Sequence, residues 1–331
     1  MILRTTAALL LCLLTLLSPA FAQESTPEAT SESTPEIEAT DEPTPEVTPL
    51  AELPGAGQFT IQQPYGGQRR VYRLLVPQSY DAEGDGLPVV FVLHGAGGTG
   101  LGIAGFSGFS DLAEREGFIV VYPDGLNNAW NDNRPDPRVQ SVDDVGFITS
   151  ILDYLIANLN VDTDRVYTVG YSMGGMMSYR LGCDARDRFA AIGSVASTMP
   201  EYLIPLCDGV TPLPVLVIQG TDDNVVPWVG YRGGYLSARN TLAHWGALNG
   251  CADQAPAMEV LPDADPGDGT LVVLETHTDC AEGSEVALYG VHNGGHTWPG
   301  RAIQAPFDLG LTTRDFEASE VIWEFFSRHS L

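Results

Sequence analysis

Apolar residues between positions 87 and 291 are concentrated in short runs. The densest is the uninterrupted run at 89–93, similar runs recur at 118–122, 166–169, 190–195 and 213–218, and a further strand is predicted at 285–291. Continuous Val, Phe and Leu without alternation is typical of strands buried on both faces of a parallel sheet. Two earlier runs, residues 58–63 and 69–76, alternate partially and are separated by Gly66-Gly67. This spacing predicts an antiparallel hairpin ahead of the parallel strands.

The clearest helical pattern covers residues 143–159. One apolar stripe runs through it at three- and four-residue spacing: Val145, Ile148, Ile151, Leu152, Leu155, Ile156 and Leu159. Asp143 and Asp144 precede the stripe, where the positive end of a helix dipole favours acidic side chains. Strands alternating with helices predict an α/β fold with a mostly parallel central sheet and helices on both faces. Functional side chains are then expected in loops at the carboxyl ends of the strands.

The first 22 residues have the pattern of a secretory signal peptide, with Arg4, an apolar run at 7–17 and the small-x-small triplet at 20–22. A run of about 11 apolar residues is too short to span a bilayer, so no stable membrane insertion is expected. Residues 23–54 repeat Thr-Pro-Glu units with nine acidic residues and no basic one, which predicts a disordered linker. Residues 55–331 are long enough for one domain. We expect a secreted monomer, free or held at the cell surface through the acidic linker.

Charge and composition exclude several classes of function. All 16 basic residues are arginine, which excludes lysine Schiff-base chemistry and a lysine-dependent phosphate loop. Residues 55–331 contain 34 acidic residues against 15 arginines, a net charge of −19. Such a charge repels nucleic acid, anionic lipid and polyanionic polysaccharide. A small ester, or a neutral polymer or oligomer, remains compatible as partner.

Four cysteines lie in the predicted domain: Cys183, Cys207, Cys251 and Cys280. An even set in an exported chain favours two disulfides, and three pairings are possible. We expect Cys183 with Cys207 and Cys251 with Cys280, because these pairs close the shortest loops without crossing. A metal site is the competing interpretation, but the spacing lacks a C-x-x-C pair. Neither a metal nor a cofactor is expected.

The sequence Gly170-Tyr171-Ser172-Met173-Gly174 joins a predicted strand to a helix-like stretch at 175–181. This is the pattern of a nucleophile elbow, a sharp strand-to-helix turn that exposes a serine. Glycine is needed two residues before and after the serine because the strand and helix backbones approach closely. The alternative is a serine in an ordinary glycine-rich loop. The pattern makes Ser172 a candidate nucleophile and the chain a candidate ester hydrolase.

Two later loops supply candidate partners, in the chain order serine, acid, histidine. A neighbouring imidazole must remove the proton of the serine hydroxyl, and a carboxylate must hold that imidazole in one tautomer. We expect Asp223 to be the acid, with Asp222 as its competitor. We expect His296 to be the base because flanking glycines let its loop fold toward Ser172, although His292 lies nearer the strand end.

A glycine-rich loop, residues 94–98, follows the buried run 89–93. Backbone amides of Ala96 and Gly97 could form one half of an oxyanion hole there, with the amide of Met173 as the second half. His94 would then shape the loop and transfer no proton. A phosphate-binding function of these glycines is weak, since the lysine and hydroxyl of a P-loop are missing.

Several segments together resemble one known family, in its order, from about Pro64 to His329: "LHGAGG", "YPDGLNNAWND", "DDVGF", "DTDRVYTVGYSMGGMMSYRL", "GTDDNVVPW", "GGHTWPG" and "TTRDFEASEVIWEFF". The chain resembles the polyhydroxybutyrate-depolymerase/feruloyl-esterase family of secreted α/β-hydrolases. The resemblance implies the α/β-hydrolase fold and puts the family's nucleophile, acid and base on Ser172, Asp223 and His296. It also implies that Trp130, Asn131 and Trp298 line the acyl pocket; core packing is the alternative for each tryptophan.

The preferred function is a secreted serine carboxylic-ester hydrolase that works through an acyl-enzyme. Feruloyl-esterase activity on acyl esters of plant polysaccharides is the first expectation, and poly-3-hydroxybutyrate depolymerase activity is the second. A serine peptidase could use the same three residues. A catalytically inactive binding protein displayed on the acidic linker is the alternative outside catalysis, but it would not need an ordered nucleophile, acid and base.

Overall fold

The structure is a computed structural model that describes residues 47–48, 55–209, 211–251, 255–303 and 308–331. The predicted signal peptide, and the predicted linker apart from residues 47–48, lie outside the described residues. The unit that begins at Pro45 contains every element described below. Within the described ranges, no helix combines the length and apolar character needed to cross a membrane.

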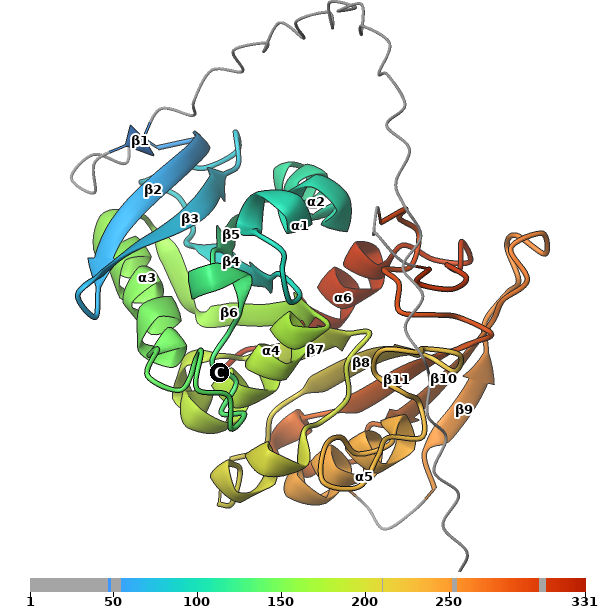
Figure 1. The fold of residues 1–331 in the computed structure, drawn as a ribbon. Coiled ribbons are helices and arrows are strands. Elements are labelled where there is room, and N and C mark those ends of the chain that lie inside the picture. Colours follow the sequence, from blue (N-terminus) through green and yellow to red (C-terminus); the bar gives the residue numbers. More distant parts are fainter. Residues whose placement is uncertain (1–46, 49–54, 210, 252–254, 304–307) are drawn as a thin grey trace, which may run out of the picture. The chain divides into compact units, whose positions relative to one another are not determined.

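One sheet organises the described part of the chain, with the strand order β1-β2-β3-β5-β4-β6-β7-β8-β11-β10-β9 (Figure 1). The strands are β1 (Val47–Thr48), β2 (Gly57–Tyr65), β3 (Gln68–Val76), β4 (Leu87–Leu93), β5 (Ile119–Pro123), β6 (Val161–Tyr171), β7 (Ala191–Val195), β8 (Val215–Gly220), β9 (Ala257–Val260), β10 (Leu271–His277) and β11 (Val286–His292). Neighbours from β5 through β4, β6, β7 and β8 to β11 pair in parallel. The expected mostly parallel sheet is confirmed.

Antiparallel strands flank the parallel centre on both sides. The expected hairpin is β2 and β3, paired from Gly57 opposite Val76 to Tyr65 opposite Gln68. On the other side β10 pairs antiparallel with both β11 and β9. The sequence did not predict β9 and β10, because all four residues of β9 are exposed and its neighbour alternates irregularly, so neither strand presents a dense apolar run.

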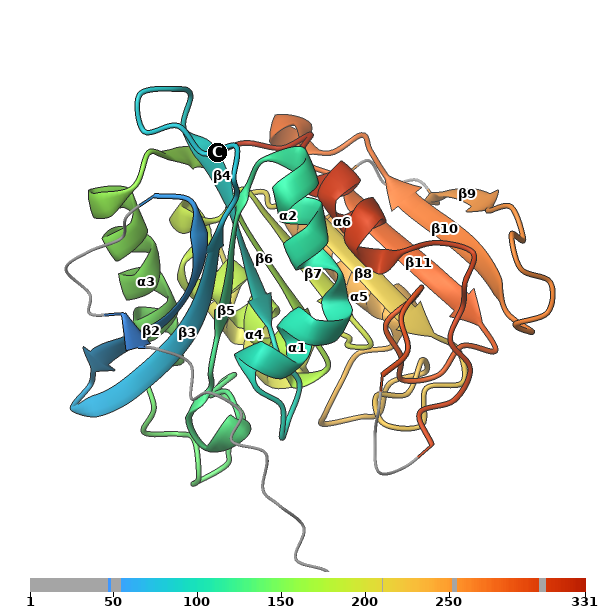
Figure 2. The same cartoon turned by 90° about the horizontal axis from the view of Figure 1, so that it is seen from above.

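Six helices of the described residues cover the two faces of the sheet (Figures 1 and 2). Their bounds are α1 (Gly100–Ser107), α2 (Phe109–Glu116), α3 (Asp144–Asn158), α4 (Met173–Asp184), α5 (Ala238–Leu248) and α6 (Ala318–Phe326). Buried side chains of α3, α4 and α5 belong to one hydrophobic layer, which we call the α4 layer. Those of α1, α2 and α6 belong to a second, which we call the α1 layer.

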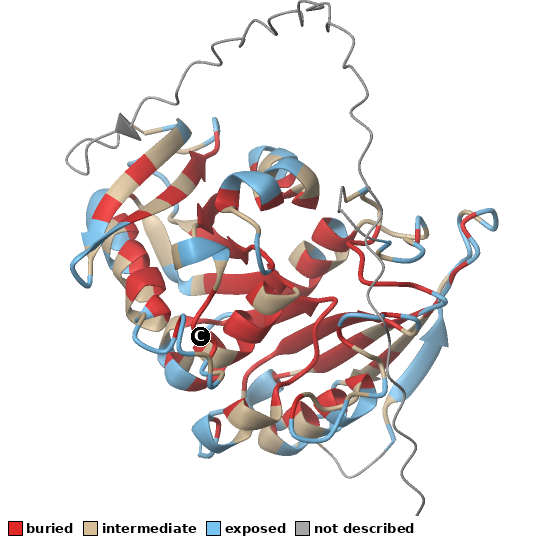
Figure 3. Ribbon diagram, viewed as in Figure 1, coloured by how far each residue is buried: buried red, intermediate tan, exposed pale blue. Residues whose placement is uncertain are grey.

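Strand β4 shows why its sequence does not alternate. Val89 and Phe91 pack into the α4 layer, whereas Val90 and Val92 pack into the α1 layer. All four side chains are completely buried. Strands β5, β7 and β8 are buried along their whole length for the same reason, and β6 is buried from Val166 onward (Figure 3). A strand covered on both faces needs apolar side chains at successive positions.

Helix α3 begins one residue later and ends one residue earlier than the predicted range 143–159. Asp143 is its N-cap, and its carboxylate accepts a hydrogen bond from Gly146 N. Ile148, Ile151, Leu152 and Leu155 are buried as expected, but Ile156 is 39% exposed. Phe147, outside the expected stripe, is completely buried beneath the guanidinium of Arg70. The buried face of the helix is therefore rotated toward Phe147.

Both expected disulfides are present in the structure. Cys183, at the end of α4, is bonded to Cys207, and Cys251, after α5, is bonded to Cys280. Each bond ties a helix end to a loop on the α4 side of the sheet. Cross-links of this kind stabilise a fold mainly by restricting the unfolded chain.

A buried ion pair fixes the start of α3 to the hairpin. Arg70 on β3 contacts Asp144 at 2.6 Å, and their side chains are 1% and 0% exposed. The second carboxylate oxygen of Asp144 accepts a hydrogen bond from Asn131 N at 2.7 Å. Arg70 also donates to the carbonyl of Asp124. The pair therefore holds both ends of the loop that connects β5 to α3.

Removing either of two adjacent aspartates should have very different effects on stability. Asp144→Ala leaves the Arg70 charge buried and unpaired and should lower the free energy of unfolding by about 3–5 kcal/mol. Asp143→Ala removes an exposed helix cap and should cost about 1 kcal/mol. Urea unfolding of both variants measures the difference. Equal losses would contradict the importance assigned to the buried pair.

Candidate active site

Ser172 lies on a strained turn between β6 and α4. It has φ 54° and ψ −118°, a left-handed conformation that is rare outside glycine. A Cβ on Gly170 would lie 2.0 Å from the backbone of Gly174, and a Cβ on Gly174 would lie 2.1 Å from the carbonyl oxygen of Leu93. Both glycines are therefore required by the close approach of three backbones. The turn leaves Ser172 at the N-terminus of α4.

Asp223 and His296 meet at the carboxyl edge of the sheet. Nδ1 of His296 lies 2.8 Å from Oδ2 of Asp223, and both residues are almost fully buried. Oδ1 of Asp223 accepts hydrogen bonds from the amides of Val225 and Val226, at 2.8 and 2.7 Å. These two bonds fix the carboxylate, which in turn orients the imidazole so that Nε2 is the ring nitrogen left for another partner.

The competing residues lie elsewhere. Asp222 is exposed and accepts a hydrogen bond from the hydroxyl of Thr221. His292 ends β11 as an exposed side chain. Of the two candidate aspartates and the two candidate histidines, the structure brings together Asp223 and His296.

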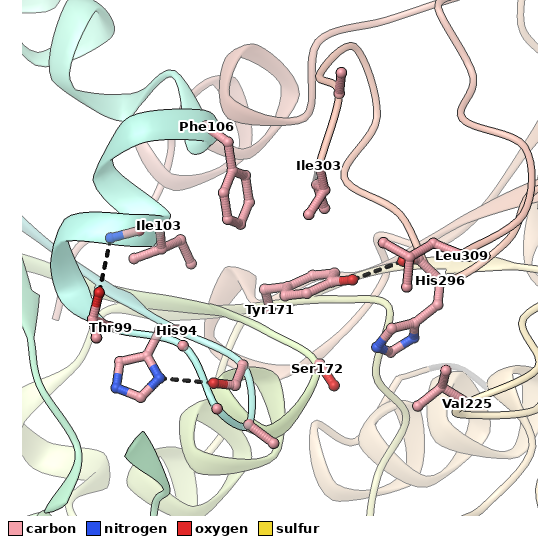
Figure 4. A pocket seen from close by; sticks show the side chains of 16 residues that line it. His94, Thr99, Ile103, Phe106, Tyr171, Ser172, Val225, His296, Ile303 and Leu309 are labelled. Carbon is pink, nitrogen blue, oxygen red and sulfur yellow. Dashed lines mark hydrogen bonds between the residues drawn. The ribbon is translucent and has the colours of Figure 1, made fainter. Parts of the chain in front are cut away.

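Two supporting residues were not identified from the sequence. Gln219, at the end of β8, donates a hydrogen bond to Oδ2 of Asp223 at 2.9 Å. Tyr171, directly before the serine, donates its hydroxyl proton to the carbonyl oxygen of His296 at 2.7 Å (Figure 4). A glutamine at a strand end and a tyrosine inside the elbow carry no pattern of their own. Only the folded arrangement shows that they hold the acid and the base.

The loops of the acid and the base are packed backbone to backbone. A Cβ on Gly220 would lie 2.2 Å from the carbonyl oxygen of Gly294, and a Cβ on Gly295 would lie 1.9 Å from that of Leu309. The amide of His296 donates to the same carbonyl of Leu309 at 2.6 Å. Gly295, beside His296, thus allows the close packing of this loop against the backbone of Leu309.

The loop at residues 94–98 lies beside Ser172, as expected of an oxyanion loop. The expectation that Gly97 is one of the donors is wrong. The amide of Gly97 donates to the carbonyl of Asn128 at 2.8 Å, so it is engaged within the fold and is not available to an oxyanion. Ala96 N and Met173 N have no backbone hydrogen-bond acceptor among the described residues. Ala96 and Met173 therefore remain as the pair of candidate donors.

His94 holds this loop in place through both ring nitrogens. Nδ1 lies 2.8 Å from the carbonyl oxygen of Gly95, and Nε2 accepts a hydrogen bond from the amide of Gly125 at 2.9 Å. One nitrogen must donate and the other accept, which requires the neutral imidazole. Burial lowers the pKa of His94 below the usual histidine value and favours the same state. His94 is thus a positioning residue with no free nitrogen for proton transfer.

A cavity of about 620 Å³ opens at Ser172 and His296 (Figure 4). Its apolar wall comes from Ile103 and Phe106 on α1 and from Ile303 and Leu309 beyond the base. The loop at residues 94–99 forms its floor. A cavity of this size fits a small organic group, and its apolar wall suits an aliphatic or aromatic one.

Trp130, Asn131 and Trp298 do not line this cavity, contrary to the expectation. Trp130 is completely buried, donates Nε1–H to the carbonyl of His94 and packs against its ring at 4.7 Å. Asn131 donates to the carbonyl of Val142. Trp298 is also completely buried, among rings that include Phe106 and Tyr171. The two tryptophan rings pack behind residues that line the cavity. Trp130 belongs to the α4 layer and Trp298 to the α1 layer.

The described residues include side chains of the kinds that bind metal ions. Across the described ranges, no group of three or more His, Cys, Asp or Glu side chains is arranged to hold a metal ion. The groups that the site does present are a serine hydroxyl at a helix N-terminus, a histidine held by a carboxylate, and the backbone amides of Ala96 and Met173.

Fold and site together define an α/β-hydrolase. Residues 64–258 match the family described as "Putative esterase". The relative "Putative esterase NocK" from Nocardia uniformis subsp. tsuyamanensis is 32% identical over 301 residues, which cover 84% of this chain and 86% of the relative. The chain belongs to this esterase family and is a carboxylic ester hydrolase.

Other comparisons agree with the fold and the class. "Feruloyl esterase D" from Neurospora crassa is 25% identical over 280 residues, 81% of this chain and 85% of that relative. The solved acetyl xylan esterase from Aspergillus awamori superposes with a TM-score of 0.56 at 16% identity, covering 82% of this chain and 99% of that one. At that identity the superposition shows a shared fold alone.

Replacing His94 tests whether the loop at residues 94–98 acts in catalysis. His94→Ala removes the acceptor of Gly125 N and the donor to Gly95 O, so the amide of Ala96 loses its fixed position. We expect kcat on p-nitrophenyl butyrate to fall about 10²-fold, as when one oxyanion donor is lost. KM should change far less. His244→Ala, at another partly buried histidine remote from the cavity, is the control, and an equal loss of kcat in both variants would contradict the assignment.

Proposed function

We propose that the protein is a serine esterase that works through an acyl-enzyme. Ser172 attacks the ester carbonyl, His296 takes its proton and returns it to the leaving alcohol, and Asp223 orients His296. The amides of Ala96 and Met173 hold the oxyanion. The observation that carries the proposal is the 2.8 Å contact of His296 with Asp223 at the cavity that Ser172 also lines. Water then cleaves the acyl-enzyme with the same histidine as base.

The substrates we propose are acyl esters of plant polysaccharides, with feruloyl esters first. Two facts support this class: relatives are named feruloyl esterase and acetylxylan esterase, and the cavity beside Ser172 is apolar and sized for a substituted aromatic ring. Phe106 offers such a ring an aromatic partner in the cavity wall. An aliphatic polyester such as poly-3-hydroxybutyrate is the second candidate, because the same wall accepts an aliphatic chain.

We also propose that the enzyme is secreted. The pattern of the first 22 residues supports export, and so do the disulfides Cys183–Cys207 and Cys251–Cys280, since such bonds persist in oxidising compartments. Retention at the cell surface by the acidic linker belongs to the same proposal.

One set of assays tests the nucleophile and the substrate class together. The protein and its Ser172→Ala variant are compared on p-nitrophenyl butyrate, methyl ferulate, a poly-3-hydroxybutyrate film and a peptide anilide. We expect turnover of both soluble esters and a loss of about 10⁴-fold or more in the variant. Equal rates for the two proteins would refute Ser172 as nucleophile. Activity on the film without activity on methyl ferulate would replace the proposed substrate by a polyester.

The two histidines at the end of β11 provide a matched pair for testing the base. His296→Ala should lower kcat by about 10⁴-fold because the serine loses its proton acceptor. His292→Ala should change kcat less than threefold, since surface substitutions away from a site have small effects. Steady-state rates on p-nitrophenyl butyrate give both values. The reverse ranking would assign the base to His292.

A further inference from the structure

We infer that the segment Val225 to Tyr235 carries a second binding subsite, which takes a neutral sugar ring on the alcohol side of the ester, with Tyr231 as its platform. This inference rests on the proposed function. The acyl group and the alcohol group of an ester extend in different directions from the carbonyl carbon. An ester in which both groups are larger than methyl therefore needs two separate binding subsites. The cavity of about 620 Å³ provides one of them.

The cavity lies on one side of the sheet edge. Ile103 and Tyr171 belong to the α1 layer, and Phe106 and Ile303 pack against it. The hydroxyl of Ser172 points away from Phe106 and Ile303 (Figure 4). A group bonded on the far side of the reacting carbonyl therefore faces the loops above the α4 layer.

Those loops present an unusual exposed surface directly after the acid. Val225, Val229 and Tyr231 are 42%, 77% and 52% exposed, although Trp228 of the same segment packs against the α4 layer. Val225 also lines the cavity, so the exposed surface begins at the reaction centre. Exposed apolar side chains grouped beside a site indicate a contact surface.

The segment is held rigidly, as a binding platform requires. Tyr231 N donates to Tyr235 O at 3.0 Å, and Leu236 N donates to Met199 O at 2.9 Å in the loop after β7. The rings of Tyr231 and Tyr235 meet edge to face at 5.0 Å. Tyr235 is the more buried of the two, so it supports a Tyr231 ring that remains open to solvent.

A polar group lies within electrostatic reach of the platform: burial raises the pKa of Tyr235, and the charge of Arg134 opposes that rise. Arg134 binds the buried carboxylate of Asp132 through Nε and Nη2, at 2.7 and 2.6 Å, and Tyr202 donates its hydroxyl proton to the same carboxylate. Arg134 Nη2 also contacts the sulfur of Met176, one helical turn after Ser172. The side chain of Arg134 is 21% exposed. Because Asp132 neutralises it, it offers hydrogen bonds without a net charge.

These features match the chemistry of a sugar. A sugar ring has a C–H face, which packs on an aromatic ring, and a rim of hydroxyls, which accept hydrogen bonds from a guanidinium or a tyrosine. A neutral donor group in a strongly acidic domain favours an uncharged saccharide over a uronic acid. Xylose and arabinose units of an esterified oligosaccharide have this chemistry.

The test is a ratio of specificities. The protein is assayed on methyl ferulate, whose alcohol half is methanol, and on a feruloylated arabinoxylo-oligosaccharide. Tyr231→Ala should lower the ratio of kcat/KM, oligosaccharide over methyl ferulate, about 5- to 10-fold, chiefly through KM. Tyr231→Phe retains the ring and should keep the ratio. Ile156→Ala, at an exposed apolar residue of α3, is the control that should leave the ratio unchanged. A ratio unchanged in Tyr231→Ala, or lowered equally in Ile156→Ala, would overturn the inference.

A second measurement separates this inference from the substrate class. If the protein hydrolyses p-nitrophenyl butyrate but neither methyl ferulate nor the feruloylated oligosaccharide, feruloyl esters are refuted as its substrates. The sugar subsite is then tested alone by calorimetric titration of Ser172→Ala with unesterified arabinoxylo-oligosaccharide. Binding that is lost in the double variant Ser172→Ala/Tyr231→Ala supports the subsite. No binding to Ser172→Ala, or equal binding to both proteins, would overturn it.

Discussion

The close approach of three backbones at Ser172 is the constraint on which the rest of the site depends. Strand β6, helix α4 and the end of β4 meet where Gly170 and Gly174 leave no room for a Cβ. The contact forces Ser172 into a left-handed conformation and places the first turn of α4 beside the end of β4 and His94. Such strain persists only where the surrounding structure enforces it. Here the two buried layers of the sheet do so, and one turn thus positions both the hydroxyl and one candidate oxyanion donor.

The acid, the base and His94 each lie on a loop that hydrogen bonds hold in place. Asp223 is held by two amides of its own loop and by Gln219, and His296 by Asp223 and by the backbone of Leu309. The loop at His94 is tied to the turn at Gly125. Loops that are anchored to one edge of a rigid sheet keep the reacting groups in a fixed arrangement. One side of this edge holds the apolar cavity, and the other carries the exposed segment that we propose as the sugar subsite.

The sequence predicted what depends on local pattern. Dense apolar runs located the buried strands, and glycines at fixed offsets located the turn at Ser172. The sequence did not predict the features that depend on the direction in which a side chain or a backbone amide points. Trp130 and Trp298 complete hydrophobic layers behind the cavity, and the amide of Gly97 is engaged by Asn128, because loop conformation decides which way each group points. The edge strand β9 and its neighbour β10 were missed for a related reason: without burial on both faces they lack the dense pattern.

Trapping of the acyl-enzyme tests the central claim most directly. The protein is mixed with p-nitrophenyl butyrate, quenched in acid within the first turnover, digested and analysed by mass spectrometry. The account predicts one butyryl group, carried by the peptide that contains Ser172, and none in protein mixed with butyrate and p-nitrophenol. A butyryl group on a different residue, or turnover without any covalent adduct at early times, would contradict nucleophilic catalysis by Ser172.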